Sequence, residues 1–352
     1  MNAEVRATPL LVTGAAGWLG RALCAEVGQN HEKYAISRLV VMVRSQQEKE
    51  VLAGSFVSSN DFAVKYVLAD ITRPDEVATL FDNLDEPFDV IHTAGIIHPK
   101  KISDLYAVNE TGTRTVMQLA HERGAARVVH VSSNSPFGNN PHPEDLFRNS
   151  EPFNPYMAYG DSKMRGEIAV QENVDRGLDA VIVRPPWFYG PFQPARQTTF
   201  FSMVKSGRFP VFGSGNQRRS MVYIDNLTDG IMRARNWSGP AGRAWWIADA
   251  RPYRVDEIVS TVGRALTDEG FSVKKNSLRI PNLIGNLAEV ADGLVQKTGR
   301  YVQPVHVLGE MNKTIACSIS DATADLGYRP NVDLYEGMRR SIRWCAEQGI
   351  EL

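Results

Sequence analysis

The hydrophobic positions in the first half of the chain fall in short continuous runs. Six of these runs are candidate strands: Leu10–Thr13, Leu39–Val43, Val64–Leu68, Val90–Thr93, Val128–Ser132 and Ala180–Val183. Continuous apolar runs are typical of parallel strands that are covered on both faces. Longer stretches between them predict four helices: Trp18–Val27, Asp75–Phe81, Asp104–Glu122 and Ala158–Asn173. This alternation predicts an α/β fold with a doubly wound parallel sheet.

The pattern changes after Arg184. The stretch PPWFYGPFQPARQ is rich in proline and aromatic residues and indicates a structured loop. Two later stretches predict helices, Tyr253–Ala265 and Pro281–Val295, and two short apolar runs predict returns to the sheet, Val222–Ile224 and Trp245–Ile247. We therefore expect a smaller C-terminal substrate-binding lobe. The predicted division gives the sheet domain residues 1–184, with returns near 213–250 and 314–330. The lobe takes 185–212 and 251–313, and a C-terminal helix takes 331–352.

A glycine-rich turn follows the first predicted strand. In LLVTGAAGWLGRAL, Gly14, Gly17 and Gly20 lie between an apolar strand and the start of a helix. A tight turn, a close approach of pyrophosphate and close helix–strand packing each favour a residue without a side chain. Backbone N–H groups at a helix start also attract phosphate. The turn predicts a Rossmann-type dinucleotide site, with Ala16, Trp18 and Leu19 among the residues beside the cofactor.

The end of the second predicted strand bears on the choice of cofactor. NAD sites usually carry an acidic residue there, whereas the 2′-phosphate of NADP requires a cation. In RLVVMVRSQQ this position is Arg44, followed by Ser45. A guanidinium can bind phosphate oxygens through two parallel hydrogen bonds. The sequence favours NADP over NAD, and the alternative interpretation is an arginine that points to solvent.

Tyr159 and Lys163 supply candidate chemistry. They stand at i and i+4 in YMAYGDSKMRGE, so a helix places them on one face. A Y-x-x-x-K pair alone is common by chance. Here it follows the glycine turn and a strand that ends in HVSSNSPFG. That order is what makes the pair a candidate catalytic site.

With these residues in place, the sequence resembles the extended short-chain dehydrogenase/reductases, including the NAD-dependent epimerase/dehydratase and 3β-hydroxysteroid dehydrogenase groups. The resemblance covers essentially the whole chain. Its matching segments are TGAAGWLG, LADIT, HTAG, VNETGT, VSSNSPFG, YGDSK, RPPWFYGP, RRSMVYIDN and LGYRP.

The resemblance implies roles for individual residues. Tyr159 would be the general acid/base, Lys163 would favour its phenolate and bind the nicotinamide ribose, and Ser133 would hold the substrate oxygen. Ser132 and Ser135 are the alternatives for the serine. The further implied cofactor contacts are Asp70 and Ile71 at the adenine, Thr93, Ala94 and Gly95, Asn109, Ser132, and Pro185 and Pro186. Asn109 has the alternative of serving only the backbone. The implied substrate contacts are Ser133, Asn134, Trp187 and Arg219. The helices at Asp104–Glu122 and Ala158–Asn173 resemble the family's dimer interface, which implies a homodimer.

The family's reactions leave alternatives. Dehydratases carry a Thr-Asp-Glu cluster where this chain has Ser133-Asn134-Ser135, so we set dehydration aside. Nucleotide-sugar epimerases usually have Asn where this chain has Trp187. Arg219 matches an arginine that grips a sugar-nucleotide phosphate, with a surface charge as its alternative. The apolar PNLIGNLAEVADGLV segment favours the steroid-dehydrogenase-like branch. We expect an NAD(P)-dependent oxidoreductase of secondary alcohols or ketones. A UDP-sugar epimerase with retained NAD and a non-catalytic NADP sensor are the alternatives.

Composition narrows the possible partners. The chain has 39 basic and 40 acidic residues and a formal net charge of -1, so its charge gives no footprint for nucleic acid or for anionic lipid. No run approaches the 18 apolar residues of a membrane span. Cys24, Cys317 and Cys345 are scattered without metal-ligand spacing. We expect a cytoplasmic protein with a small-molecule substrate, no bound metal and no nucleic-acid or membrane partner.

Overall fold

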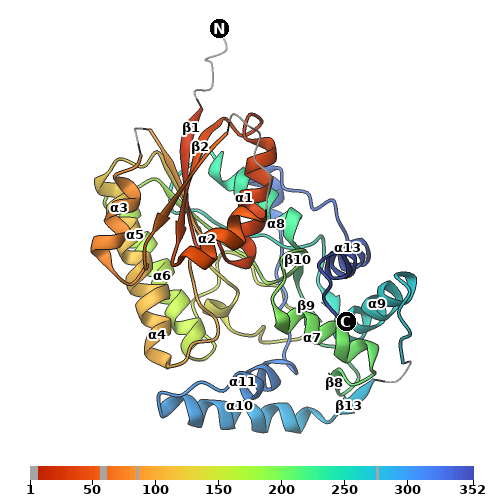
Figure 1. The fold of residues 1–352 in the computed structure, drawn as a ribbon. Helices are drawn as coiled ribbons and strands as arrows, with labels where there is room; N and C mark the ends of the chain where they lie inside the picture. The colour runs from red at the N-terminus through yellow and green to blue at the C-terminus, as the bar shows by residue number, and fades with distance from the viewer. Residues whose placement is uncertain (1–6, 56–61, 85–86, 275–276) are drawn as a thin grey trace.

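The computed structural model describes residues 7–55, 62–84, 87–274 and 277–352. Its centre is a seven-stranded sheet in the order β11-β6-β5-β4-β1-β2-β3, in which all neighbouring strands are parallel (Figure 1). The strands are β1 (Thr8–Thr13), β2 (Ile36–Val43), β3 (Ala63–Leu68), β4 (Asp89–His92), β5 (Arg127–Val131), β6 (Ala180–Arg184) and β11 (Ala244–Trp246). All six predicted strands are confirmed, and β11 confirms the predicted return near Trp245–Ile247. The predicted α/β, Rossmann-type sheet is therefore correct.

Strand order reverses beside β1, since β2 and β3 lie on one side of it and β4 on the other. In sheets of this kind ligands bind at the carboxyl ends of the strands, next to that reversal. Every residue of β4, β5 and β6 is buried, as the continuous apolar runs predict. The edge strand β3 is the exception, and its Leu68 is exposed.

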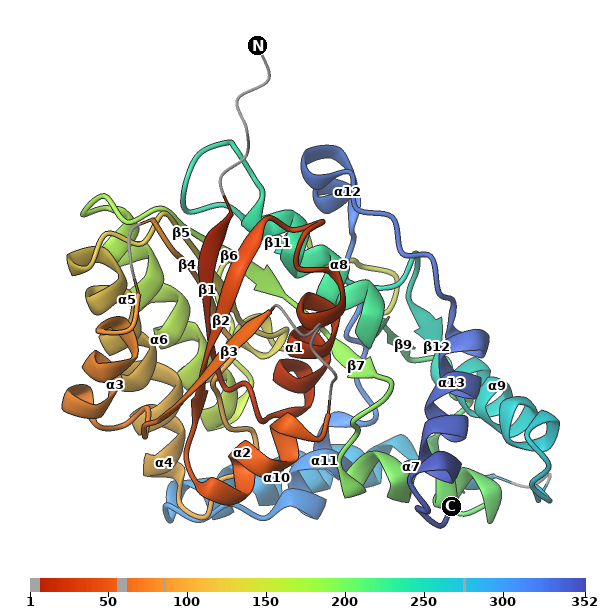
Figure 2. The same cartoon turned by 45° about the horizontal axis from the view of Figure 1, so that its top comes forward.

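Helices cover both faces of this sheet. Figures 1 and 2 place α3, α4, α5 and α6 on one face and α1 and α8 on the other. Their bounds are α1 (Trp18–Asn30), α3 (Pro74–Phe81), α4 (Ile102–Tyr106), α5 (Thr113–Glu122), α6 (Met157–Val174) and α8 (Ile224–Arg235). The predicted helix at Asp104–Glu122 is interrupted by a π-helical segment, η1 (Ala107–Gly112). The short α2 (Gln46–Ala53) and η2 (Ser135–Phe137), and the longer α8, were not predicted.

The second half departs further from prediction. The expected return of Val222–Ile224 to the main sheet is wrong, because β10 (Met221–Tyr223) pairs with β7 (Trp187–Tyr189) in a separate two-stranded sheet. The expected loop after Pro186 contains β7 and a full helix, α7 (Ala195–Lys205). The other elements are β8 (Pro210–Phe212) with β13 (Leu278–Ile280), β9 (Arg218–Arg219) with β12 (Tyr253–Arg254), α9 (Val255–Asp268), α10 (Asn282–Lys297) and α11 (Gln303–Glu310). The predicted helices at Tyr253–Ala265 and Pro281–Val295 correspond to α9 and α10.

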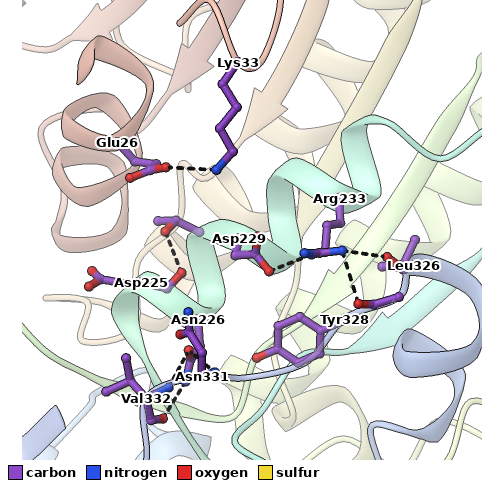
Figure 3. Close-up of polar contacts among 12 residues, drawn as sticks. Glu26, Lys33, Asp225, Asn226, Asp229, Arg233, Leu326, Tyr328, Asn331 and Val332 are labelled. Atoms are coloured by element: carbon purple, nitrogen blue, oxygen red, sulfur yellow. Dashed lines mark hydrogen bonds and ion pairs between the residues drawn. The ribbon is translucent and has the colours of Figure 1, made fainter. Parts of the chain in front are cut away.

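The chain ends with α12 (Ser320–Leu326) and α13 (Leu334–Glu347), which dock on α8 and α9. Figure 3 shows how α8 holds the segment between them. The Asn226 amide donates to the Val332 carbonyl (2.8 Å) and its oxygen accepts from the Asn331 and Val332 N–H groups. Two turns on, Arg233 donates to the carbonyls of Leu326 and Gly327 at the end of α12. One face of α8 thus ties the C-terminal segment to the sheet domain.

Candidate active site

The glycine turn between β1 and α1 has the geometry that a dinucleotide requires. Gly14 has φ +68°, and a Cβ there would lie 2.7 Å from the backbone of Ala94. A Cβ on Gly20 would lie 2.2 Å from the Gly14 carbonyl oxygen. Gly17 has an ordinary φ of -71° and only one close neighbour, at 3.1 Å. Gly14 and Gly20 are therefore required by the fold itself, whereas Gly17 leaves open space at the helix start.

The start of α1 is suited to an anion. Gly17 is its N-cap, and within the described chain no side chain caps the helix and no acidic residue occupies its first turn. The unpaired N–H groups and the positive end of the helix dipole attract phosphate. These features fit the pyrophosphate of NAD(P), which residues 14–20 would hold. Beside them, the Trp18 indole donates to the Pro191 carbonyl (2.7 Å), which joins the turn to the segment before α7.

The end of β2 carries the residues predicted to select the cofactor. The Arg44 guanidinium donates to the Glu48 carboxylate at 2.5 and 2.8 Å, and its side chain is 63% exposed. Ser45 is the N-cap of α2 and accepts from the Glu48 N–H group. At the end of β3, Asp70 accepts from Thr72, and these hydrogen bonds lower the pKa of the Asp70 carboxyl. Arg44 thus stands at the expected place with an exposed acidic partner, and its contact with a phosphate stays a prediction.

The end of β4 comes close to the start of the sheet and to η1. Thr93 donates to the Thr13 carbonyl (2.7 Å), and Gly95 faces the Asn109 amide. That amide both donates to the Ile96 carbonyl and accepts from the Ile96 N–H group, each at 2.9 Å. The same amide donates to the Ser162 hydroxyl (3.0 Å) and so joins the segment after β4 to α6, and its contact with the cofactor stays a prediction. Ile71 packs against Gly112 of η1.

Tyr159 and Lys163 lie on one face of α6, below the end of β5. The Lys163 ammonium is buried and donates to the Val131 carbonyl (2.9 Å). Burial lowers the pKa of Lys163 to about 8, against the opposing effect of the Glu167 carboxylate. Burial also raises the pKa of the Tyr159 phenol, while a side-chain hydrogen bond with Ser133 acts in the opposite direction. The fold thus assembles a phenol, an amine and a hydroxyl in one place.

Of the three candidate serines, Ser133 is the one whose side chain acts to lower the pKa of the Tyr159 phenol. Its hydroxyl lies 3.3 Å from the Ser135 hydroxyl, so Ser135 is a neighbour of the pair. The Ser132 hydroxyl is buried without a hydrogen-bond partner among the described residues. Asn134 begins the short η2 turn directly after Ser133.

The predicted substrate side is mainly apolar. Trp187 is 37% exposed, packs edge-on against Phe200 (5.3 Å between ring centroids) and donates to the Gln197 side chain. Pro185 and Pro186 before it are buried. Such a surface suits an apolar ligand better than a hydrated phosphate.

Arg219, on β9, already has an acidic partner. Its guanidinium donates to the Glu310 carbonyl (2.5 Å) and lies 3.9 Å from the Glu310 carboxylate. The predicted phosphate-binding residue is therefore paired with an acid from the last turn of α11.

Two charged residues that no sequence pattern indicated act on Tyr159. The Glu310 carboxylate raises the pKa of the Tyr159 phenol and the Arg196 guanidinium lowers it, both to a smaller extent than burial. Arg196 lies over the Trp18 ring at 5.8 Å. Both residues reach the site only through tertiary folding. Arg196 lies in the proline- and aromatic-rich stretch after Arg184, but that pattern does not indicate a contact with Tyr159, and Glu310 lies in none of the matching segments.

A polar cluster joins α10 and α11 to the first turn of α6. His306 Nδ1 lies 2.7 Å from Asp292 Oδ2, and Gln296 donates to the same oxygen (2.8 Å). The Gln296 side-chain oxygen accepts from the Ala158 N–H group (3.1 Å), one residue before Tyr159. Among residues 7–55, 62–84, 87–274 and 277–352, no group of His, Cys, Asp and Glu could hold a metal, and no helix could span a membrane.

Proteins of related sequence match this chain over nearly its whole length. An uncharacterized protein of Sinorhizobium fredii is 41% identical over 97% of this chain and 96% of its own. A 2-alkyl-3-oxoalkanoate reductase of Stenotrophomonas maltophilia is 26% identical over 94% of this chain and 97% of its own. A 3beta-hydroxysteroid-dehydrogenase/decarboxylase of Arabidopsis thaliana is 24% identical over 94% of this chain and 78% of its own.

Solved structures agree on the fold. The UDP-glucuronic acid 4-epimerase of Bacillus cereus, in complex with UDP-glucuronic acid and NAD, superposes with a TM-score of 0.74 at 20% identity, covering 97% of this chain and 99% of its own. The model of the NAD dependent epimerase/dehydratase family matches residues 10–248. The chain therefore belongs to the NAD-dependent epimerase/dehydratase family of extended short-chain dehydrogenase/reductases, whose members are NAD(P)-dependent dehydrogenases, dehydratases and epimerases.

Proposed function

We propose that this enzyme transfers a hydride between NAD(P) and an apolar secondary alcohol or ketone with net turnover of the cofactor. Its catalytic residues are Tyr159, Lys163 and Ser133. Two relatives are named for chemistry of this kind, one on a 3β-hydroxysteroid and one on a 2-alkyl-3-oxoalkanoate. The exposed Trp187 ring on Phe200 supports an apolar substrate.

The observation that carries the proposal is the pairing of Arg219 with Glu310. A nucleotide sugar brings a diphosphate, and the arginine expected to bind it already lies beside a carboxylate. The phenol of Tyr156, one turn before Tyr159, has its pKa raised by burial and by the carboxylates of Glu289, Glu310 and Asp292. These carboxylates would repel the diphosphate of a nucleotide sugar, which would be a second one beside that of the cofactor. It is compatible with an uncharged carbonyl group.

In this proposal the substrate oxygen lies between the Ser133 hydroxyl and the Tyr159 phenol. When bound, the nicotinamide supplies or accepts the hydride at the substrate carbon. In the reducing direction Tyr159 donates its phenolic proton to the oxygen, which completes the alcohol. Burial raises the pKa of Tyr159 and so favours its protonated form, which is the form that donates in the reducing direction. The Lys163 ammonium then stabilises the phenolate that is left, because an adjacent opposite charge favours the ionised form.

The cofactor itself is held by residues 14–20, which form the uncapped start of α1. We propose NADP in preference to NAD, because Arg44 is placed at the end of β2 with its side chain exposed. A homodimer through α4, α5 and α6 and a cytoplasmic location remain proposals of the same kind.

Two other functions stay open. A UDP-sugar epimerase is supported by the family model, but the resemblance to the Bacillus cereus enzyme at 20% identity concerns the fold alone. A non-catalytic NADP sensor would have no need of the Ser133, Tyr159 and Lys163 set.

The test is a titration of the purified protein with NADPH and NADH, followed by absorbance assays with apolar ketones and with UDP-sugars. We expect apolar ketones to oxidise the reduced cofactor stoichiometrically and UDP-sugars to bind weakly. Tight binding of a UDP-sugar, with inversion and no net change in the cofactor, would establish the epimerase instead. Cofactor binding without turnover of any substrate would favour the sensor.

A further inference from the structure

Helix α10 exposes its large apolar residues and buries a glycine and an aspartate, which is the reverse of an ordinary surface helix. Leu283, Leu287, Val290 and Leu294 are each 60–65% exposed, whereas the buried residues of the helix are Gly285 and Asp292. Surface helices normally bury their apolar stripe and expose their polar one. The spacing of the four exposed residues, i, i+4, i+7 and i+11, puts them on one side of about three turns.

The inward side of α10 accounts for its attachment without these residues. Gly285 packs against the Asn312 side chain, and Gly309 of α11 packs against the backbone of Glu289. Asp292 and Gln296 make the polar contacts to His306 and Ala158 described above. The outward leucines and valine therefore contribute little to the fold, and their apolar character calls for another explanation.

The apolar surface extends beyond α10. Val302 and Val307, at and within α11, are also exposed, as is Leu278 of β13 before α10. In Figure 1, α10 runs along the lower edge of the molecule with α11 above it, and no other drawn element lies below. We call the outward residues Leu283, Leu287, Val290, Leu294, Val302 and Val307 the α10 face.

The exposed charged residues that flank α10 along the described chain are basic. Exposed Arg279 precedes the helix, and exposed Lys297 and Arg300 lie at its end. Lys101 joins them there, since it forms a β-bridge with Arg300. All residues of α10 are described, and none of its exposed ones is acidic. Glu289 is half-buried and paired with Lys313 at 2.7 Å.

This charge pattern distinguishes between two occupants. A second copy of the chain, paired along α10 in an antiparallel sense, would bring Arg279 against Lys297 and Arg300. Parallel pairing would bring Lys297 against itself, so either arrangement sets cations against cations. An anionic bilayer surface attracts both ends while it covers the apolar stripe. We propose that the α10 face docks in the plane of an anionic lipid membrane. The balanced net charge of the chain concealed this local arrangement.

The experiment is co-sedimentation of the full chain with vesicles of phosphatidylcholine, alone or mixed with phosphatidylglycerol. We expect binding to the anionic vesicles that weakens with added salt. Leu287→Glu with Val290→Glu should lower the partition coefficient at least about a hundredfold, because two side chains lose their apolar burial. Lys297→Gln with Arg300→Gln should lower it about 25-fold, since each cation near an anionic surface contributes about fivefold.

Val51→Glu is the matched control, because Val51 is an exposed apolar residue on α2 and is not part of the α10 face. It should bind vesicles like the unchanged protein, and thermal unfolding checks that every variant is folded. The proposal is overturned if neither kind of vesicle binds, or if Val51→Glu lowers binding as much as the α10 changes. It is equally overturned if sedimentation in solution reveals a dimer that Leu287→Glu with Val290→Glu dissociates, since a second copy then covers the face. None of these readouts depends on the reaction proposed above.

Discussion

Helices α6 and α10 are the two longest of the described chain, and they meet at the candidate active site with opposite designs. Helix α6 buries polar groups and gives each a partner: Lys163 donates to Val131, Glu167 pairs with Arg184 at 2.6 Å, and Ser162 accepts from Asn109. Helix α10 exposes its large apolar residues and fixes itself through glycine contacts and a few polar bonds. Buried paired charge holds α6 in one position, which a proton-transfer site requires. The outer side of α10 has no such constraint and is available for another surface.

The largest expected effect comes from removing the Tyr159 hydroxyl of α6, which tests whether this helix carries the proton-transfer site. Tyr159→Phe should lower kcat by about 10²–10⁴-fold, because the phenol is the proposed proton donor. Cofactor affinity, measured by fluorescence titration, should stay nearly unchanged. Tyr156→Phe is the control, because the Tyr156 hydroxyl is buried without a hydrogen-bond partner among the described residues. Equal losses in both variants would remove Tyr159 from its proposed role.

A second prediction concerns the cost of burying Lys163. Its pKa falls from 10.5 to about 8 on folding, so the unfolded chain holds this proton more tightly than the folded one. The penalty is fully present below pH 8 and is relieved as the pH rises from 8 to 10.5. It amounts to about 3 kcal/mol, and the lost bond to Val131 offsets about 1 kcal/mol.

Lys163→Met should therefore abolish turnover and yet raise the free energy of unfolding at pH 7 by about 2 kcal/mol. Urea unfolding at several pH values measures this, and the gain should disappear above pH 10. Lys33→Met, at an exposed lysine, should not reproduce this gain in the free energy of unfolding. A variant that is less stable than the natural chain at pH 7 would mean that the buried amine is not penalised.

The third prediction tests cofactor choice at the end of β2. Arg44→Asp should weaken NADP binding at least tenfold, since a charge-assisted hydrogen bond contributes about 1.5–3 kcal/mol. The competing exposed ion pair with Glu48 is weaker, about 0.3–0.5 kcal/mol, so the Arg44 guanidinium should bind the 2′-phosphate in preference to Glu48. Calorimetric titration with NADP and NAD measures both affinities. Arg123→Asp, at an exposed arginine at the end of α5, controls for net charge, and unchanged NADP affinity in Arg44→Asp would place Arg44 in solvent.

Local signals carried most of what the sequence predicted correctly. The continuous apolar runs gave the strands of the main sheet, and the spacing of Tyr159 and Lys163 placed both on α6, because these patterns depend on neighbours within one element. The wrong or missing predictions concern strand pairings and side-chain partners that are set by residues far apart in the sequence. Met221–Tyr223 looks like a sheet strand, but its partner is the equally short Trp187–Tyr189. The pairing of Arg219 with Glu310, and the action of Arg196 on Tyr159, join segments that no local pattern connects. Composition likewise could not indicate that the leucines of α10 face outward.

The smallest expected effect comes from a change at the contact between α6 and α10, and it tests the contrast between these two helices. Gln296 of α10 accepts from the Ala158 N–H group in the first turn of α6, directly before Tyr159. Gln296→Ala removes this bond and the one to Asp292, so the free energy of unfolding should fall by about 1–2 kcal/mol. The first turn of α6 also loses a support, so kcat should fall several-fold while KM changes less. Leu294→Ala, two residues earlier on the outward side, is the matched control and should change stability by less than about 0.5 kcal/mol. If Leu294→Ala proved as costly as Gln296→Ala, the outward side of α10 would be packed rather than exposed, and the contrast between the two helices would fail.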